Sequence, residues 1–320
     1  MEKLERCQEQ LEALVDELID PERVPNLPPA TEQNVKEWCA AATPSKDELD
    51  KMRRVEAEFV EALGSWSVRA GHSYTYERVK VVPAGSTQKG TSVKGRFDLD
   101  VVVFIPEFNP SKMDEYQREA HKRLQGRPSR VERVRNTPAG SSFKYEDVKV
   151  DVLFTGEQRG SDPISYKSEA TRLYMASLTQ KQIDFVKRHT GDVERDVIRG
   201  FKKWIKDSSW DSLRAPSSYL IEVLVIHTAM QPWGSPNAKL DGKPLPVTDS
   251  NRLGLFRRVC NSLADLHNAK INVANDAIPH GIEAPYILDP VNPHNNLLDG
   301  LKPRALAHIF QAAKLKHTNN

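Results

Sequence analysis

The sequence predicts an α+β fold, with a mixed sheet in the first half of the chain and mainly helices in the second half. Two observations predict it. Short runs rich in valine, tyrosine and phenylalanine, typical of strands, end at Thr155. Beyond that residue, apolar side chains recur at helical spacing. A chain of 320 residues is long enough for two lobes, which we place at residues 1–160 and 161–320.

The expected elements follow from these patterns in order along the chain. Two helices are predicted before the sheet, at Leu4 to Leu18 and at Asp47 to Leu63. The sheet and its one connecting helix are predicted at Tyr76 to Val82, Leu99 to Ile105, Ser111 to Leu124 (the helix), Phe143 to Tyr145 and Val148 to Phe154. The later helices are predicted at Ser168 to Ser177, Gln180 to His189, Val193 to Asp207, Ser217 to Met230, Arg252 to His267 and Arg304 to Lys314, with a Gly- and Pro-rich loop at Pro232 to Pro246.

Composition excludes several classes of protein. The 46 basic and 44 acidic side chains nearly cancel, so no overall basic footprint for nucleic acid is present. Cys7, Cys39 and Cys260 lie too far apart for zinc-ligand spacing or a disulfide framework, and we expect them to be reduced. No apolar run approaches the roughly 20 residues that cross a bilayer, and no secretory signal opens the chain. We therefore expect a cytoplasmic protein, with the nucleus as the alternative, and no membrane partner.

Two aspartates within one apolar strand carry the main functional signal. Asp98 and Asp100 are two residues apart, so their carboxylates leave the strand on the same face and repel one another unless a cation lies between them. Asp151 begins another apolar strand and supplies a third carboxylate. Oxygen ligands of this kind suit Mg²⁺, with Mn²⁺ as a substitute. We predict that Asp98 and Asp100 hold two Mg²⁺ ions, that Asp151 holds the ion on the nucleophile side, and that all three are catalytic.

A short glycine- and hydroxyl-containing segment precedes the aspartates. Gly85 allows the backbone to approach an oxyanion closely, Ser86 offers a hydroxyl, and Lys89 neutralises phosphate charge. We expect a flexible loop here that binds the triphosphate of a nucleotide. A single aspartate at a strand end is more often a turn or capping residue, but the combination of this loop with three aspartates is typical of nucleotidyltransferases.

These motifs resemble those of the 2′-5′-oligoadenylate synthetases. The resemblance is carried by Gly85 to Thr91, Asp98 to Phe104, Ile198 to Trp204, Pro216 to Glu222 and Tyr286 to Leu297. It implies a bilobal nucleotidyltransferase fold with the active site in the cleft, and ATP as both donor and acceptor. It also implies that Arg199 and Lys202 bind triphosphate or acceptor groups and that Tyr219 stacks on adenine. The structural alternatives are a solvated helix face for Arg199 and Lys202, and a core aromatic for Tyr219.

The chain departs from the family at several positions. Gln88 replaces a usual glycine, and Pro83 replaces a lysine that contacts double-stranded RNA in vertebrate members. The resemblance suggests double-stranded RNA as an activator, and these departures weaken that expectation. The Cys-Phe-Lys tripeptide linked to oligomerisation is missing, so a monomer is expected.

Four functions stay open at this point. The leading one is synthesis of 2′-5′-linked oligoadenylates with release of pyrophosphate. A cyclic dinucleotide synthase resembling cyclic GMP-AMP synthase is the alternative, followed by an inactive sensor of RNA or nucleotide and by a polymerase that extends RNA tails. The sequence leaves the linkage, 2′-5′ or 3′-5′, the product length and the choice between linear and cyclic products undecided.

Overall fold

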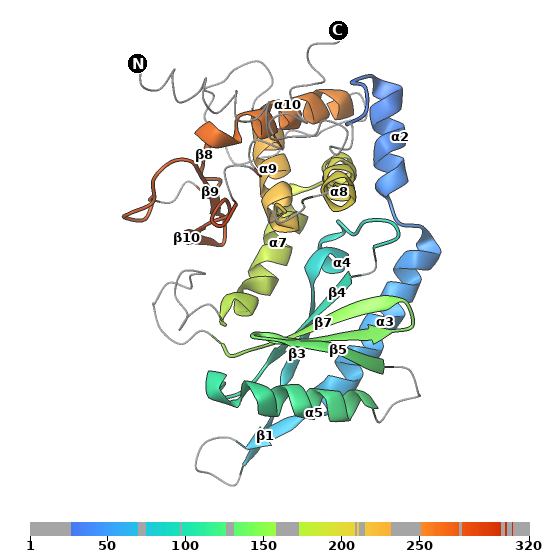
Figure 1. Ribbon diagram of the computed structural model, residues 1–320, viewed down its shortest axis with the longest axis vertical. Helices are drawn as coiled ribbons and strands as arrows, with labels where there is room; N and C mark the ends of the chain where they lie inside the picture. Colours follow the sequence, from blue (N-terminus) through green and yellow to red (C-terminus); the bar gives the residue numbers. More distant parts are fainter. Residues whose placement is uncertain are drawn as a thin grey trace. The chain divides into compact units, whose positions relative to one another are not determined.

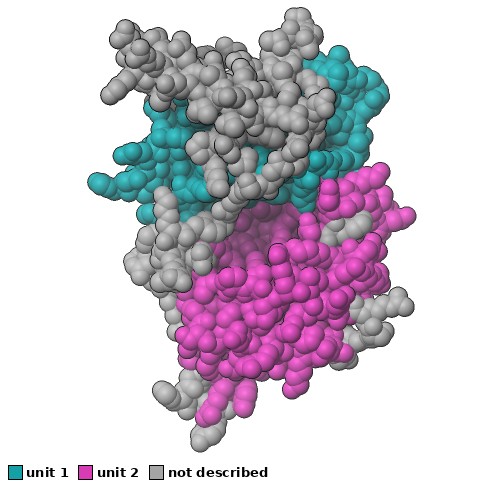
Figure 2. All heavy atoms as spheres, in the orientation of Figure 1, with its two compact units in different colours: residues 1–43, 189–320 teal, residues 44–188 magenta. Residues whose placement is uncertain are grey.

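Contacts between residues divide the chain into two compact units, coloured separately in Figure 2. The computed structural model describes residues 27–69, 75–96, 98–125, 131–157, 173–208, 210, 215–231, 251–274, 277–301, 305 and 309. Unit 1 contains the described parts of Met1–Thr43 and His189–Asn320, and unit 2 those of Pro44–Arg188. This division differs from the predicted boundary at residue 160, because residues near the start of the chain pack with the second half.

A five-stranded mixed sheet forms the centre of unit 2. Its strands lie in the order β3 (Lys80–Ala84), β4 (Asp98–Phe104), β7 (Val148–Thr155), β6 (Gly140–Tyr145) and β5 (Val131–Thr137). β4 and β7 run parallel, and the other neighbours run antiparallel. The mixed sheet confirms the predicted fold class, and it places the two aspartate-bearing strands next to each other.

Two strands of unit 2 differ from the sequence prediction. The predicted strand at Tyr76 to Val82 is divided into β2 (Tyr76–Arg78) and β3, and β2 pairs with β1 (Ser67–Arg69) in a separate two-stranded sheet. β5 was missed because its sequence, Val-Glu-Arg-Val-Arg-Asn-Thr, is mainly polar and its side chains are mostly exposed. An edge strand of this kind shows no apolar alternation.

Two helices cover one face of the five-stranded sheet (Figure 1). They are α3 (Lys46–Gly64), which begins at a capping box formed by Ser45 and Glu48, and α5 (Met113–Gln125), which follows a 3₁₀ turn at Pro110–Lys112. Phe59 of α3 packs edge-on against Phe143 and Tyr145 of β6. Both helices lie close to their predicted positions, and they leave the opposite face of β4 and β7 for polar side chains.

Unit 1 is built mainly from helices. α8 (Asp192–Asp207), α9 (Ser218–Met230) and α10 (Arg252–Ala264) match their predictions, although the predicted end of α10 at His267 is a separate 3₁₀ turn, Leu266–Asn268. In unit 2, α7 (Thr179–His189) also matches and follows a 3₁₀ turn at Met175–Leu178.

A helix that the sequence analysis missed, α2 (Glu32–Ala42), packs on α8 and α10. Trp38 of α2 lies edge-on against Phe201 and Phe256, with ring centroids 5.1 and 5.4 Å apart respectively. These contacts explain why the described residues before Pro44 belong to unit 1.

The expectation of no strands after Thr155 is wrong. A three-stranded sheet in unit 1 has the order β10 (Asn292–Asn296), β9 (Tyr286–Asp289), β8 (Lys270–Ile271). β9 is buried at all four positions and β10 is polar, so neither shows a two-residue alternation. The Asn296 side chain accepts hydrogen bonds from the amides of Ile287 and Leu298, which helps hold this short sheet together.

Several predicted elements lie wholly or mostly outside the described residues. These are the helix at Leu4 to Leu18, the loop at Pro232 to Pro246, the first part of the helix at Ser168 to Ser177, and most of the helix at Arg304 to Lys314. Among the helices in the described ranges, none is both long and apolar enough to cross a bilayer. Cys39 and Cys260 are buried and form no disulfide, and burial raises the pKa of the Cys39 thiol to about 12.

Packing of α2 on α8 predicts that Gly200→Ala destabilises the protein. Alanine is the better helix former by about 1 kcal/mol, but its Cβ would lie 2.4 Å from Cζ3 of Trp38. Overpacking of this kind costs about 1–3 kcal/mol, so we expect a net loss in the free energy of unfolding, measured by urea denaturation. Gly64→Ala is the matched control, since a Cβ there meets nothing within 4 Å. Equal stability of the two variants would contradict the packing.

Candidate active site

The sheet brings the three predicted aspartates together on one face of unit 2. In the parallel pairing of β4 and β7, Asp100 stands opposite Asp151, and Asp98 lies two residues earlier on β4. Leu99 and Val101 alternate with these aspartates and belong to the core covered by α3 and α5. The carboxylates therefore lie on the face away from that core, as the two-residue spacing predicted.

The environment of Asp100 makes its charge costly. Burial, together with the neighbouring charges of Asp151 and Asp98, raises the pKa of Asp100 to about 6 against the opposing effect of Lys89 and Lys149. Removal from water and like charges both disfavour a carboxylate. A cation bound beside Asp100 would offset that cost.

The Asp100 carboxylate leaves no space for a side chain at position 85. Gly85 has φ +70°, and a Cβ built on it would lie 2.0 Å from Oδ2 of Asp100. Any other residue would therefore have to displace the carboxylate as well as adopt a strained backbone. The resemblance pointed to this glycine for phosphate binding, and the structure shows that it also leaves space for the Asp100 carboxylate.

The segment after Gly85 is a short helix, α4 (Gly85–Lys89), and not the flexible loop that we expected. It ends at Gly90, which has φ +74° and donates its amide to the Ser86 carbonyl. Lys89 is buried and lies close enough to Asp100 to lower its pKa. Gln88, the departure from the family pattern, donates a 2.8 Å hydrogen bond to the buried Glu56 of α3. That bond ties α4 to α3, which gives Gln88 a structural role.

Two residues that the sequence analysis did not single out hold the Asp151 carboxylate. Ser142 of β6 donates its hydroxyl to Oδ1, and the Lys149 ammonium lies 2.7 Å from Oδ2. Lys149 precedes Asp151 by two residues, so the alternation that identified the aspartates could also have found it. Ser142 is opposite Asp151 through the hairpin of β6 with β7, and the two residues between the strand runs that end at Tyr145 and begin at Val148 were a signal for that hairpin.

The residues on this face fit a divalent ion. Carboxylate oxygens are the ligands that Mg²⁺ prefers, and a cation, the Lys149 ammonium, already lies on one of them. Within the described part of the chain, no three His, Cys, Asp or Glu side chains are yet grouped so as to enclose a metal. The two Asp151 oxygens are engaged by Ser142 and Lys149.

The other predicted site residues lie in unit 1, on two helices that are joined by a buried ion pair. Lys202 of α8 lies 3.0 Å from Glu222 of α9, and their side chains are 2% and 1% exposed. Arg199 pairs with Asp196 at 2.8 Å, and Asp196 also pairs with Arg252 of α10. Neither cation is part of a solvated helix face, and their contacts with a triphosphate stay a prediction.

Tyr219 is half-buried at the start of α9, and its hydroxyl is bonded. It donates a 3.1 Å hydrogen bond to Oδ1 of Asp289, which also accepts from the amide of Val291. Asp289 is buried and belongs to the Ile-Leu-Asp-Pro motif that contributed to the resemblance. The structure thus connects two of the recognised motifs through one carboxylate. Stacking of the Tyr219 ring on adenine stays a prediction.

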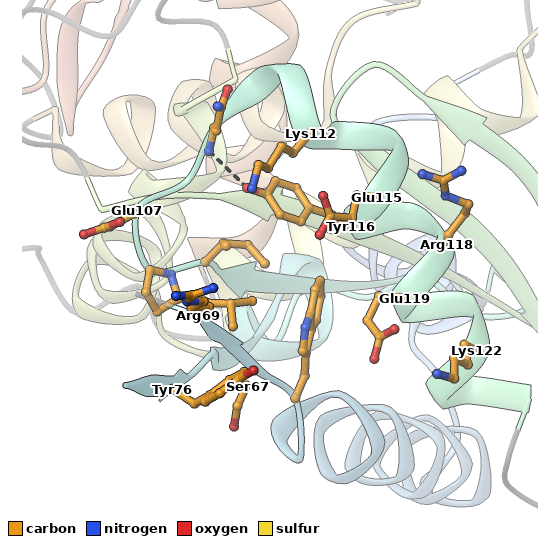
Figure 3. Close-up of a pocket in the computed structure, with 15 residues that line it drawn as sticks. Ser67, Arg69, Tyr76, Glu107, Lys112, Glu115, Tyr116, Arg118, Glu119 and Lys122 are labelled. Carbon is orange, nitrogen blue, oxygen red and sulfur yellow. Dashed lines mark hydrogen bonds between the residues drawn. The ribbon is translucent and has the colours of Figure 1, made fainter. Parts of the chain in front are cut away.

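A cavity of about 730 Å³ lies on the other side of unit 2, where β1, β2 and α5 meet (Figure 3). Its wall carries four basic side chains, Arg69, Lys112, Arg118 and Lys122, and three acidic ones, Glu107, Glu115 and Glu119. None of the predicted site residues lines it. Because its charges nearly cancel, it does not offer a field suited to a triphosphate.

Comparison with known proteins identifies the fold. No family model matches the chain. The CCA-adding enzyme of Sulfurisphaera tokodaii is 22% identical over 282 residues, which cover 85% of this chain and 56% of that enzyme. The chain thus spans about half the length of this curated relative.

Solved structures of two further proteins are similar. CdnC of E. coli MS115-1, in a complex with HORMA-deltaN, has a TM-score of 0.60 at 19% identity and covers 90% of this chain and 89% of its own. Cid1 poly(U) polymerase bound to Mg and 3′-dATP has a TM-score of 0.57 at 13% identity, covering 89% and 93%. The fold is therefore the α+β nucleotidyltransferase fold, as predicted.

The raised pKa of Asp100 predicts a pH-dependent effect of Asp100→Asn on the metal-free protein. Below the unfolded pKa of 3.8 the carboxyl is protonated in both states, and as pH rises through about 6 the folded wild type must accept a costly charge. The variant avoids that charge, so its advantage in free energy of unfolding should grow by up to about 3 kcal/mol between pH 4 and 7. Denaturant unfolding in EDTA measures it.

Asp147→Asn is the control for this experiment. A hydrogen bond from Lys51 holds the pKa of Asp147 below its usual value, so its contribution to stability is present above pH 3.8 and is lost as pH falls. The Asp147→Asn variant should therefore lose stability relative to the wild type as pH rises. A difference between Asp100→Asn and the wild type that does not change with pH would contradict the electrostatic account.

The buried pair of Lys202 and Glu222 predicts a large cost for removing one partner. Lys202→Met leaves Glu222 charged and buried, and such a loss costs about 3–5 kcal/mol. The double variant Lys202→Met/Glu222→Leu should recover most of that loss, which urea denaturation would show. Lys203→Met removes a neighbouring, more exposed lysine paired with Asp207 and serves as the control. Equal, small effects of Lys202→Met and Lys203→Met would rule out a structural role for the pair.

Proposed function

We propose that the chain is a metal-dependent nucleotidyltransferase that joins ATP molecules through 2′-5′ linkages and releases pyrophosphate. The observation that carries the proposal is the face of the sheet on which paired strands place Asp98, Asp100 and Asp151, beside a glycine that admits no side chain. This arrangement is costly for folding in the absence of a cation, and a costly cluster of charges on a polar face is typical of a catalytic site. The fold shared with nucleotidyltransferases supports the same reaction class.

In this proposal the three aspartates bind the metal ions, and Lys89 positions the donor phosphates. Asp98 and Asp100 would hold the Mg²⁺ ions, and Asp151 would hold the ion on the nucleophile side. When bound, Mg²⁺ lowers the pKa of an attacking hydroxyl and neutralises the charge of the triphosphate. Lys89 and Ser86 would bind donor phosphates. Lys89 already lies close enough to act on the charge of Asp100.

The bonds balance as in any nucleotidyl transfer. The acceptor hydroxyl oxygen forms a bond to the α-phosphorus of the donor, the bond from that phosphorus to the bridging oxygen breaks, and pyrophosphate leaves with that electron pair. The hydroxyl proton passes to solvent. Catalysis then depends mainly on how this chain's side chains orient the two substrates and offset charge.

The motifs in unit 1 favour the oligoadenylate reaction over others of its class. Arg199 and Lys202 would bind triphosphate or acceptor groups, and Tyr219 would stack on adenine. The hydrogen bond from Tyr219 to the buried Asp289 fixes the position of the ring, which supports a role as a base platform. Double-stranded RNA is the activator that we propose to test, and a monomer is the proposed assembly.

A second candidate is a cyclic dinucleotide synthase. This alternative also starts from ATP, and the structure of CdnC, which was solved with ATP, is similar to this chain over most of its length. Extension of RNA ends is a third candidate, favoured by the similarity to Cid1 poly(U) polymerase and to the CCA-adding enzyme. All three reactions use the same carboxylates and differ in the acceptor.

The test is incubation of the protein with ATP and Mg²⁺, with and without double-stranded RNA, followed by mass spectrometry and linkage-specific nuclease digestion. We expect linear 2′-5′ oligomers and pyrophosphate, and at least a 100-fold loss of rate in Asp98→Ala and Asp151→Ala, on the order expected when a group that stabilises the transition state is removed. Both variants should keep the wild-type circular dichroism spectrum because they remove no core packing.

Asp184→Ala, an exposed aspartate on α7, is the matched control and should keep wild-type rates. Cyclic products from a mixture of ATP and GTP would move the chain to the second candidate. Addition of nucleotides to a supplied RNA end would move it to the third. Full activity in Asp98→Ala or Asp151→Ala would contradict the proposed site.

A further inference from the structure

Lys149 carries a positive charge on the strand that holds Asp151. Its side chain leaves β7 on the same face as Asp151, and its ammonium lies 2.7 Å from Oδ2 of that carboxylate. The pairing of β4 with β7 places Lys149 opposite Asp98. The two paired strands therefore carry this lysine together with all three aspartates.

The two oxygens of Asp151 are held differently. Ser142, whose side chain is buried, donates a hydroxyl to Oδ1 and fixes the orientation of the carboxylate. Oδ2 is held by Lys149, whose side chain is 42% exposed on a flexible stem. Exposed ion pairs contribute only about 0.2–1 kcal/mol, so the contact at Oδ2 is the one that a ligand can replace.

A divalent ion and the ammonium cannot share Oδ2 at hydrogen-bonding and coordination distance at once, because like charges so close repel strongly. We propose that Lys149 is a tethered cation that occupies the Asp151 position in the metal-free protein and competes with a divalent ion for it. Lys149 thereby sets the metal concentration at which the site loads. The inference rests on the proposed metal site and adds a residue to it.

The competition explains two features of this face together. In the metal-free protein the ammonium partly neutralises a group of carboxylates that would otherwise repel one another. The same contact keeps the Oδ2 atom of Asp151 engaged until an ion replaces it. Loading then requires the lysine stem to move, with no change in the backbone.

The test is a titration with Mn²⁺ in the absence of nucleotide, in which electron paramagnetic resonance measures the free ion. Lys149→Met keeps the stem and removes the charge, so its Kd for Mn²⁺ should be about tenfold lower than that of the wild type. Lys149→Arg keeps the charge and should bind Mn²⁺ no more tightly than the wild type. Lys122→Met on α5 changes the net charge of the protein equally and should leave the Kd unchanged.

The outcomes separate this inference from the proposed function. Equal Kd values in the wild type, Lys149→Met and Lys122→Met would overturn the competition while leaving the metal site standing. Weaker binding by Lys149→Met would also overturn it, because the lysine would then support the site. No Mn²⁺ binding by any variant would overturn the competition and the proposed metal site together. Thermal unfolding identifies a misfolded variant, and Lys149→Gln replaces Lys149→Met in that case.

Discussion

The parallel pairing of β4 with β7 places Asp100 directly opposite Asp151, and the arrangement of the proposed site depends on that register. A shift of one residue would turn one of these carboxylates into the core under α3 and α5. The same row across the sheet includes Ala84 of β3 and Ser142 of β6. Ala84 leads directly into the glycine that makes room for Asp100, and Ser142 orients Asp151. Carboxylates, glycine and hydroxyl are thus positioned by one set of backbone hydrogen bonds.

The second consequence of this register is a concentration of negative charge that the protein offsets without a metal. Lys149 lies on Asp151, and Lys89 reduces the cost of charging Asp100. Unit 1 uses a related device away from solvent, where Glu222 and Asp196 pair with Lys202 and Arg199. In both units several of the side chains assigned to substrate phosphate or metal already have partners. In the proposed function, substrate or metal would therefore replace existing contacts, and ligand binding would be an exchange of ion pairs.

The aspartate face could be predicted from the sequence because it depends on local geometry. Side chains two residues apart on a strand lie on the same face, and the apolar residues Leu99 and Val101 to Phe104 identify the strand. The parallel pairing of β4 with β7 could not be predicted, because it joins strands far apart in the sequence. Ser142 and Lys149 were overlooked, although the hairpin of β6 with β7 and the two-residue spacing of Lys149 from Asp151 can both be read from the sequence. The burial of Lys202 depends on how α8 packs against α9, and no local pattern reports it.

Among the elements, those with strong apolar periodicity were predicted closely, and those whose stability comes from their neighbours were not. α2 has a capping residue, Thr31, but its main anchor is Trp38, which needs Phe201 and Phe256 from far along the chain. β5 and β10 are polar strands held by their partners. The helix α4 has only five residues, and its glycine start suggested a loop.

The most direct test of the central claim is anomalous diffraction from crystals grown with Mn²⁺ and a non-hydrolysable ATP analogue. The account predicts an Mn²⁺ peak at coordination distance from the carboxylates of Asp98 and Asp100, with triphosphate oxygens completing its shell. The ammonium of Lys149 should have left Asp151 if an ion binds there. An analogue bound with no ion at these aspartates, or Mn²⁺ bound only elsewhere, would contradict the claim that this face is the site of nucleotidyl transfer.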